Sequence, residues 1–468
     1  MSAVINMQPP INVLSLIQQE YEILELGGKF GLIRPSDLLW QPGMGAAPGL
    51  KVYQKQDANL AIKRSLQLIP SNAKSSQVIE DFWTDPSTTI YRRIAFSPKT
   101  EPADTLNLWI GPTVTPAQGN WQTIELYLKY VLCAGDMEAY NYLIHYLSHM
   151  LQKPEEKPGV MIVMLGGEGI GKGTLEIILR RISAATTVMV SDVDSVIGRF
   201  NSVLERAFVV FMDEALFHGD KKSTERLKSF VTSEHIQIEE KHQPERTIRS
   251  YHRFFAASNE QHFAHIGHDA RRMFYLKVSE MYKGNHAYWD KLYKAINTGE
   301  VEAMVYDLIA MDISAFNVRK PPKSIELLSQ KIQSLPPFSR FWFDVLWQGQ
   351  YVKEITGFKK DWVTGDFWKT QDIIDAYQHH AKLAQRFKTI TAQDLAANLK
   401  QICSSATNER RMVNSQRGWG YELPSIEVAR KEFDGYLGGP IDWPELNDCG
   451  AYRLPTHPGT SNLCVTCL

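Results

Sequence analysis

A glycine-rich stretch about a third of the way along the chain carries residues suited to holding a phosphate. In LGGEGIGKGT (165–174), Gly166 is followed after four residues by Gly171 and Lys172. Glycines let backbone N–H groups converge on phosphate oxygens, and a following helix adds partial positive charge at its amino end. The stretch predicts a phosphate loop in which Lys172 reaches the β- and γ-phosphates of a nucleotide. The predicted nucleotide contacts are Gly166, Gly167, Glu168, Gly169, Ile170, Gly171, Lys172, Gly173 and Thr174.

The flanking residues predict the context that such a loop needs. VMIVML (160–165) is a short apolar run typical of a buried strand, and LEIILRRI (175–182) has helical spacing. A glycine-rich turn that only connects strand to helix is the alternative. Gly173 stands where the general phosphate-loop pattern has the Ser or Thr that binds Mg²⁺. Thr174 offers the first hydroxyl, one residue late, so the metal ligand is an open question.

Two acids end the next apolar run. AFVVFMDEA (207–215) contains Asp213 and Glu214, and Asp213 comes 41 residues after Lys172. In a nucleotide hydrolase, Asp213 holds Mg²⁺ directly or through water, with Thr174 as the other candidate ligand, and Glu214 polarises the attacking water. The alternative is a strand followed by a helix-capping aspartate.

A third strand and an arginine pair complete the set. RFFAASNE (253–260) ends near Asn259, whose amide can orient the lytic water at the carboxyl edge of a sheet. DARRMFYLKV (269–278) places Arg271 and Arg272 just before a fourth strand. Either arginine could reach the γ-phosphate bound to a neighbouring subunit. A solvated basic pair is the alternative.

The segment between these strands alternates apolar and polar residues. Residues 227–253 predict a hairpin that turns at HQPE, with Lys241 and His242 near its tip. Three arginines follow the turn: Arg246, Arg249 and Arg253. A protruding basic hairpin suits contact with nucleic-acid phosphates. An ordinary charged hairpin is the alternative, because glutamates lie in the same stretch.

In this order the motifs resemble those of the superfamily 3 helicases of viruses and phages. Gly166 to Asn259 spans 94 residues, in the order of that family. The segment IEEKHQPERTI (238–248) is similar to the hairpin of papova-type viral helicases, in which a Lys-His pair tracks DNA in the channel of a ring. That match falls on Lys241 and His242.

A closer resemblance is to the helicase part of phage and plasmid primase-helicases, including those of the deep-sea vent phage primase-polymerase type. It covers roughly residues 95–350 through GGEGIGKGT, GRFN, MDEA, LKSFVTSE, SNE and SLPPFSRFW (334–342). In that family GKGT occurs naturally, so Gly173 departs only from the general loop. No segment upstream is long or acidic enough to be the family's primase-polymerase domain, which implies a separate primase or polymerase.

The resemblance implies an ATP-driven replicative DNA helicase of a phage or mobile element, with ATP and Mg²⁺ as cofactors. It implies a homo-hexameric ring that moves 3′ to 5′, with a single strand in its channel and a forked duplex as substrate. The implied catalytic residues are Lys172, Asp213, Glu214, Asn259 and either Arg271 or Arg272. Lys241 and His242 are the implied DNA contacts.

These features predict an α/β fold with a P-loop NTPase core of the AAA+-like superfamily 3 type. RRMVNSQRGWGYELP (410–424) predicts the wing of a winged-helix module, and its arginines are Arg410, Arg411 and Arg417. The expected order along the chain is an N-terminal mixed α/β region (1–118), a helical collar-like segment (119–155), the ATPase core (156–285), a helical extension (286–350), a winged-helix-like DNA-binding region (351–440) and an irregular tail (441–468).

Composition adds few constraints. The formal net charge of −1 gives no sign of a nucleic-acid partner, so such contacts must come from local basic surface. The longest apolar runs are far too short to cross a bilayer, and no signal peptide is recognisable, so we expect no membrane partner and a location in the (host) cytoplasm. Five cysteines do not make a disulfide scaffold. A zinc site at the C-terminus is a weak alternative, on Cys449, His457, Cys464 and Cys467.

Two other functions fit parts of the pattern. GKGT also occurs in adenylate-kinase-type loops, which would make the protein a nucleotide kinase. Such enzymes are about half this length and lack the DE and SNE strands. A non-catalytic, ATP-dependent origin-binding or assembly protein is the second alternative.

Overall fold

The computed structural model describes residues 12–41, 44–47, 49–213, 221–239, 245–259, 272–323, 325–353, 358–383, 389–413 and 416–444. The chain divides into two compact units, each described here by itself. One comprises Met1–Ala264 with Arg271–Ser324, and the other comprises Ile325–Leu468 with His265–Ala270. The predicted helical extension over 286–350 is therefore divided after residue 324, where the prolines of RKPPK interrupt the helices.

A five-stranded parallel sheet lies at the centre of the first unit, in the order β13-β7-β12-β9-β8. The strands are β7 Met161–Leu165, β8 Thr187–Val190, β9 Val209–Met212, β12 Arg253–Ser258 and β13 Met273–Lys277. The inner strands consist of buried residues because helices cover both faces of the sheet. The predicted α/β sheet over 160–278 is thus present.

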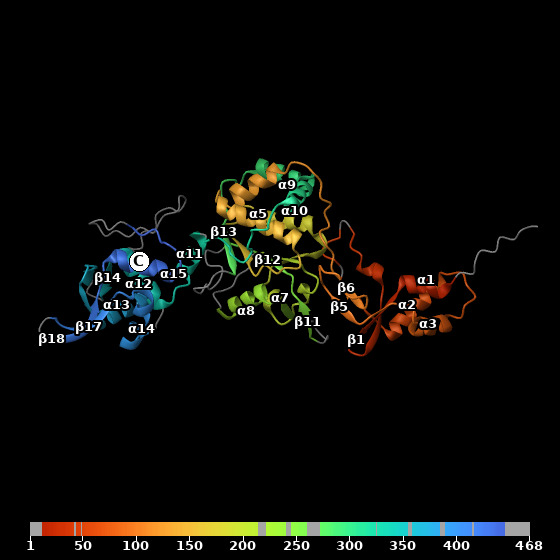
Figure 1. Ribbon diagram of the computed structural model, residues 1–468, viewed down its shortest axis with the longest axis horizontal. Helices are drawn as coiled ribbons and strands as arrows, with labels where there is room; N and C mark the ends of the chain where they lie inside the picture. The colour runs from red at the N-terminus through yellow and green to blue at the C-terminus, as the bar shows by residue number, and fades with distance from the viewer. Residues whose placement is uncertain are drawn as a thin grey trace, which may run out of the picture. The chain divides into compact units, whose positions relative to one another are not determined.

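Helices on the two faces bury these strands. Figure 1 shows α5, α9 and α10 on one side of the sheet and α7 and α8 on the other. Their bounds are α5 Met137–Gln152, α6 Thr174–Ile182, α7 Asp194–Ile197, α8 Lys221–Thr232, α9 His286–Asn297 and α10 Glu300–Ala310. Short 3-10 turns lie at Ala184–Thr186 and Ser202–Leu204.

The two helices predicted before the sheet are confirmed. α4 (Gln122–Leu126) continues into a π-helical stretch, η2 (Tyr127–Leu132), and α5 follows. Asp136 caps α5, because its side chain accepts hydrogen bonds from the backbone N–H groups of Glu138 and Ala139.

The remaining elements of the first unit precede these helices and pack partly on a core of their own around Ile17, Ile62 and Phe82. They are α1 Val13–Glu20, β1 Glu22–Leu26, β2 Lys29–Ile33, η1 Pro35–Leu38, β3 Tyr53–Gln54, α2 Lys55–Gln67, α3 Ser75–Thr84, β4 Ile90–Tyr91, β5 Arg93–Ala95 and β6 Thr105–Asn107. Two segments with strand-like sequence, YEILELGGKFGLI (21–33) and TTIYRRIAF (88–96), contain β1, β2, β4 and β5.

The predicted hairpin is shorter than expected. β10 (His235–Ile238) pairs antiparallel with β11 (Arg246–Arg249). Residues 227–232 instead complete α8, because their apolar side chains Leu227 and Val231 are one helical turn apart and both are buried. The prediction of a strand over residues 227–232 was therefore wrong, because these residues follow the period of a helix.

In the second unit, helices and the strands of one sheet follow one another in the order α12, β16, α13, α14, β17, β18. β16, β18 and β17 form a three-stranded antiparallel sheet beside α12, α13 and α14, around a core that includes Trp342, Trp368 and Tyr377. The elements are α11 Ile325–Gln333, α12 Pro337–Gln348, β14 Gln350–Lys353, β15 Phe358–Asp361, β16 Phe367–Lys369, α13 Thr370–Leu383, α14 Ala392–Ile402, β17 Thr407–Val413, β18 Gln416–Glu422 and α15 Ile426–Leu437. Helix α15 was not predicted. Within the described ranges, no helix could span a bilayer.

Candidate active site

The glycine-rich loop joins β7 to α6, as the sequence predicts. Three of its glycines have positive φ angles: Gly166 (149°), Gly169 (72°) and Gly171 (97°). A Cβ atom on Gly171 would lie 2.2 Å from the ring of Trp289, so only glycine fits there. Ile170 is almost fully buried, and a Cβ atom on Gly166 would lie 2.5 Å from its Cδ1. The loop is thus a backbone turn that packs against the side chains of Trp289 and Ile170.

Lys172 is largely buried and points back into this turn. Its Nζ donates hydrogen bonds to the carbonyl oxygens of Gly166 at 2.6 Å and Gly167 at 2.5 Å, and to Oδ1 of Asn259 at 2.6 Å. The amide nitrogen of Asn259 lies 3.4 Å from a carboxylate oxygen of Glu168. The structure therefore brings together the predicted lysine, the predicted asparagine and the loop.

The order of the strands explains this contact. β12 lies beside β7, with Ser258 opposite Leu165, so Asn259 follows its strand at the level where the loop leaves β7. The backbone N–H of Gly166 also donates to the carbonyl of Ser258 at 3.2 Å. Parallel neighbours place their carboxyl ends at one edge of the sheet, which is where ligands bind in open α/β sheets.

The two positions after Lys172 have different surroundings. Thr174 is buried, and its hydroxyl lies 3.4 Å from that of Tyr293 in α9. Gly173 has a negative φ of −67°, and a Cβ built on it meets nothing within 4 Å. Steric space therefore does not require the glycine at this position.

Asp213 lies at the same edge of the sheet, directly after β9. Its backbone N–H donates to the carbonyl of Val190 at 2.9 Å. The pKa of Glu176, in the first turn of α6, is raised mainly by burial, opposed by the charge of Arg180, and further raised by the charge of Asp213. The charge of Asp213, after β9, therefore acts on Glu176 in the loop helix. The carboxylate of Asp213 and the hydroxyl of Thr174 are oxygen donors of the kind that Mg²⁺ prefers, so these two residues would hold the metal.

Arg272 lies at the opposite edge of the same sheet. Its carbonyl accepts a hydrogen bond of 2.9 Å from the N–H of Met161, at the amino ends of β13 and β7. The loop follows the carboxyl end of β7, roughly 16 Å away along a five-residue strand. Arg272 is therefore on the wrong side to reach the loop of its own chain.

Several predicted residues lie outside the described residues. These are Glu214, Lys241, His242 and Arg271, together with the zinc candidates Cys449, His457, Cys464 and Cys467. Among the residues that are described, no group of three or more His, Cys, Asp or Glu side chains could hold a metal.

Aromatic residues that the sequence did not single out support the loop. The hydroxyl of Tyr127 donates to the carbonyl of Gly171 at 2.9 Å, and Trp289 packs against that glycine. The indole nitrogen of Trp289 donates to the carbonyl of Tyr282 at 3.0 Å. Helical spacing placed these residues on helices, but no local signal identified their partners.

Arg253 is not a surface cation, contrary to the prediction of a basic hairpin. It is fully buried at the amino end of β12, and its guanidinium carbon lies 5.1 Å from the centre of the Phe208 ring. Burial lowers its pKa to about 10, so it stays charged at neutral pH. Its hydrogen bonds go to the carbonyl groups of Tyr251 (2.9 Å), Lys153 (3.0 Å), Pro154 (3.4 Å) and Glu156 (2.6 Å).

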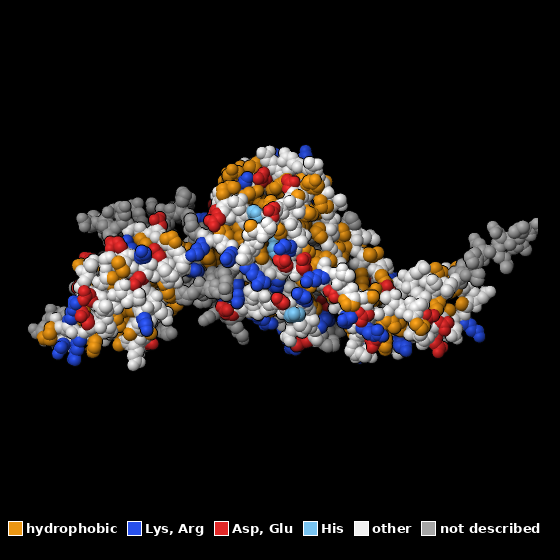
Figure 2. All heavy atoms as spheres, in the orientation of Figure 1, with side chains coloured by type: hydrophobic (Ala, Val, Ile, Leu, Met, Phe, Trp, Pro, Cys, Tyr) orange, Lys and Arg blue, Asp and Glu red, His pale blue; other side chains and the backbone are white. Residues whose placement is uncertain are grey.

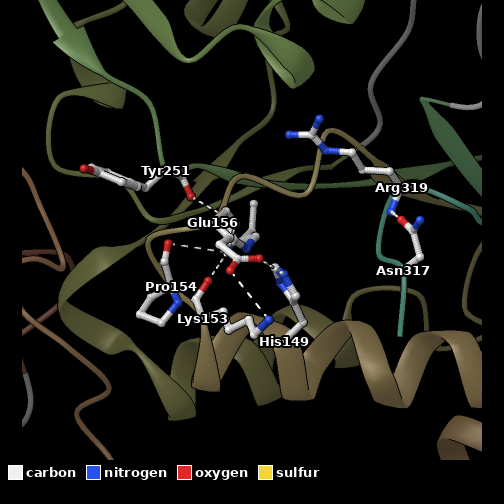
Figure 3. A network of polar contacts seen from close by, with 8 residues as sticks. His149, Lys153, Pro154, Glu156, Tyr251, Asn317 and Arg319 are labelled. Atoms are coloured by element: carbon white, nitrogen blue, oxygen red, sulfur yellow. Dashed lines mark hydrogen bonds and ion pairs between the residues drawn. The ribbon is translucent and has the colours of Figure 1, made fainter. Parts of the chain in front are cut away.

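Figure 3 shows these carbonyl groups converging on one point, with His149 of α5 directed at Glu156. Arg253 thereby ties β12 to the segment after α5 that leads into β7. Arg246 is also engaged, in a two-pronged ion pair with Glu205 at 2.5 and 2.7 Å. Of the three arginines predicted to follow the turn, only Arg249 is exposed.

A buried lysine, whose pKa burial lowers to about 7, fixes the base of the hairpin. Lys157 donates to the carbonyl of Phe230 at 2.7 Å and to the hydroxyl of Ser250. Ser250 lies 2.7 Å from Nδ1 of His252, whose Nε2 lies 2.9 Å from the carbonyl of Leu204. Burial, with a further contribution from the charge of Lys157, lowers the pKa of His252 to about 3, so the ring is neutral. Because a carbonyl only accepts, Nε2 carries the proton and Nδ1 accepts from Ser250.

The comparisons with known proteins agree with this architecture. A model of a family of unknown function (DUF5906) matches residues 164–272, from the loop to Arg272. The DNA primase-polymerase of Nitratiruptor phage NrS-1 is 26% identical over 189 residues, which are 39% of this chain and only 26% of that relative. The chain therefore matches about a quarter of the relative's length.

Solved structures extend the likeness to the fold. A structure of the apo C-terminal region of NrS-1 (A form) covers 89% of this chain and all of its own, with a TM-score of 0.64 and 15% identity. Another apo structure of that region (305-718) covers 88% of this chain, with a TM-score of 0.62 and 15% identity. The chain is homologous to this phage primase-polymerase and has the mixed α/β fold of its C-terminal region.

Proposed function

We propose that the protein is an ATP-hydrolysing DNA helicase of superfamily 3, acting in the replication of a phage or mobile element. The observation that carries the proposal is the contact of Lys172 with Asn259 at the mouth of a glycine-rich loop. A strand order of β13-β7-β12-β9-β8 with the loop after β7 supports a P-loop NTPase of the AAA+-like type. Similarity to a phage primase-polymerase supports the replication role.

Each residue of the site has a role in this proposal. ATP with Mg²⁺, when bound, supplies a phosphoanhydride whose cleavage releases free energy. When the nucleotide binds, the Nζ of Lys172 would donate to phosphate oxygens in place of the loop carbonyls. The attraction between the ammonium group and the phosphates is stronger because Lys172 is largely buried. Asp213 holds the metal, with Thr174 or water completing its ligands. Asn259 orients the attacking water, which Glu214 polarises.

The position of Arg272 favours action between subunits. Since this side chain starts from the sheet edge opposite its own loop, it can serve only the site of a neighbouring copy. That arrangement supports a ring, which we propose to be a homo-hexamer. The strand would pass through the channel in contact with Lys241 and His242, moving 3′ to 5′, while a separate primase or polymerase starts synthesis.

A strand-displacement assay on a 3′-tailed fork tests the proposal. We expect unwinding that requires ATP and Mg²⁺, with DNA-stimulated ATP hydrolysis. Lys172→Ala should abolish nucleotide binding, and Asp213→Asn should lower hydrolysis by at least about a hundredfold. Glu214→Gln should retain ATP binding and lose unwinding. Arg64→Ala, on the exposed surface of α2, is the control and should leave both activities unchanged.

The outcomes separate the alternatives. Phosphorylation of AMP by a monomer would show that the protein is a nucleotide kinase and would contradict the helicase proposal. ATP binding without hydrolysis, with Glu214→Gln fully functional in DNA binding and assembly, would point to the non-catalytic origin-binding protein. Absence of both unwinding and DNA-stimulated ATP hydrolysis would contradict the proposal that the protein is an ATP-driven helicase.

A further inference from the structure

The hairpin formed by β17 and β18 has two chemically different faces. In this antiparallel pair, Arg410 lies opposite Trp419, and Met412 lies opposite Arg417. Directly opposed residues share a face of a sheet, as do residues two apart on one strand. These four side chains therefore form one surface, which we call the wing face.

The wing face is open to solvent. Trp419 is 58% exposed and Met412 is 65% exposed, and both arginines are exposed. Figure 2 shows basic and hydrophobic side chains together over β17 and β18. Tyr421, two residues further along the same face, is buried in the core of the second unit. The same face thus continues from the core into solvent, where a large indole remains uncovered.

The opposite face of the hairpin contains its acids. Arg411 forms ion pairs with Glu409 and Glu422 and lies 5.5 Å from the centre of the Phe367 ring. The sequence predicts that Arg411 is one of the cations of the wing. In the structure its charge is instead engaged in ion pairs within the hairpin. Both acidic residues of the hairpin pair with Arg411 on that face. The hairpin therefore has no other acidic residue whose charge could offset Arg410 and Arg417 on the wing face.

The helix that precedes the hairpin offers much less charge. Along α14, the exposed charged side chains are Lys400 and Asp394, and Asp394 is engaged in a capping box with Thr391. A helix that enters the major groove of duplex DNA depends on cations for its affinity. Of these two elements, the wing face therefore has more of the chemistry that binds nucleic acid than α14 has.

An exposed indole between two guanidinium groups is suited to an unpaired strand. Unpaired bases stack on aromatic side chains, whereas the bases of a duplex are stacked on each other, and arginines bind the flanking phosphates. We propose that the wing face binds single-stranded DNA without sequence preference, with one base on Trp419 and phosphates on Arg410 and Arg417. Met412 extends the apolar platform. This site belongs to the second unit and does not depend on the proposed helicase activity.

Fluorescence anisotropy of a labelled oligothymidylate tests this site, with the full chain and no nucleotide present. Trp419→Ala should weaken binding of the single strand about tenfold, and Trp419→Phe should restore most of it. Replacing Arg410 and Arg417 together by Gln should reduce the slope of log K against log salt by roughly 1.4. Arg64→Ala, an exposed arginine on α2, should change neither quantity.

Other outcomes would overturn the proposal. One is unchanged single-strand binding by Trp419→Ala while its thermal unfolding remains that of the parent protein. A second is an equal loss for single strand and a duplex of the same length, because stacking on Trp419 should favour the unpaired strand. A third is a change in oligomeric state by light scattering without a change in DNA binding, which would make the wing face a contact between copies of the chain. ATP hydrolysis should be retained by Trp419→Ala, so failure of the motor and failure of this site are distinguishable.

Discussion

The Nζ of Lys172 lies 2.6 Å from Oδ1 of Asn259, although 87 residues separate them in the chain. This hydrogen bond joins the loop after β7 to the end of the neighbouring strand β12. The same lysine is bound to two loop carbonyls, and Asn259 adds a side-chain partner from outside the loop. A change in what Lys172 binds is therefore communicated directly to the end of β12.

Asn259→Ala should separate nucleotide binding from hydrolysis. The loop and Lys172 remain, so we expect the Kd for ATP to change by less than about fivefold. The kcat for ATP should fall about a hundredfold if Asn259 orients the attacking water, as we propose. Equilibrium binding of a fluorescent ATP analogue and steady-state hydrolysis measure the two quantities. Equal losses in both would contradict the assigned role.

Two neighbouring glycines should respond oppositely to alanine. In Gly171→Ala the new methyl group would collide with Trp289 at a φ of 97°, so the loop must distort and ATP binding should be lost. Gly173→Ala meets open space at a negative φ and should bind ATP normally. Isothermal titration of each variant measures the difference. Similar affinities for the two variants would show that the loop rearranges.

Arg272→Ala should be rescued by a second, differently inactive subunit. If Arg272 acts on the neighbouring copy, some sites of a mixed ring are complete. In those sites an Arg272→Ala subunit supplies Lys172, and its Lys172→Ala neighbour supplies Arg272. Mixing Arg272→Ala with Lys172→Ala should therefore restore part of the hydrolysis that each lacks alone. The hydrolysis rate across mixing ratios measures this. A mixture as inactive as its components, in rings shown to exchange subunits, would place the arginine outside catalysis.

Arg253→Met should destabilise the first unit strongly. Removing the guanidinium leaves carbonyl groups of the segment after α5 buried without their donor, at a cost of about 3 kcal/mol or more. Arg249→Met, an exposed neighbour, is the matched control and should cost less than about 0.5 kcal/mol. Urea unfolding gives both values. A loss of similar size in the two variants would mean that the buried hydrogen bonds contribute little.

Acid should destabilise the fold through His252. Its folded pKa of about 3 lies below the ordinary 6.5, so the contribution is complete above pH 6.5 and is lost as pH falls towards 3, when the unfolded chain binds a proton that the fold excludes. Between about pH 7.5 and 5.5 this one group should cost about 1.4 kcal/mol. His149, with a pKa of about 4 caused by burial, acts in the same direction. Urea unfolding at both pH values should show a shallower loss for His252→Gln, and an unchanged slope would refute the assignment.

The sequence by itself determined the elements around the loop. The apolar runs of β7, β9, β12 and β13 are short and continuous because both faces of each strand are covered, and α6 follows from its helical spacing. Local glycines and acids also indicated the carboxyl edge of the sheet, because those signals lie within a few residues of each strand end.

The tertiary structure decided which side chains meet. Arg253 and Arg249 have the same residue type and lie four positions apart, yet one is fully buried among carbonyl groups and the other is exposed. Arg410 and Arg411 are adjacent, but strand alternation in the pair β17–β18 directs Arg410 to solvent and Arg411 to Glu409 and Glu422. A strand's sequence gives its alternation, whereas the burial of Arg253 depends on carbonyl groups about a hundred residues earlier in the chain.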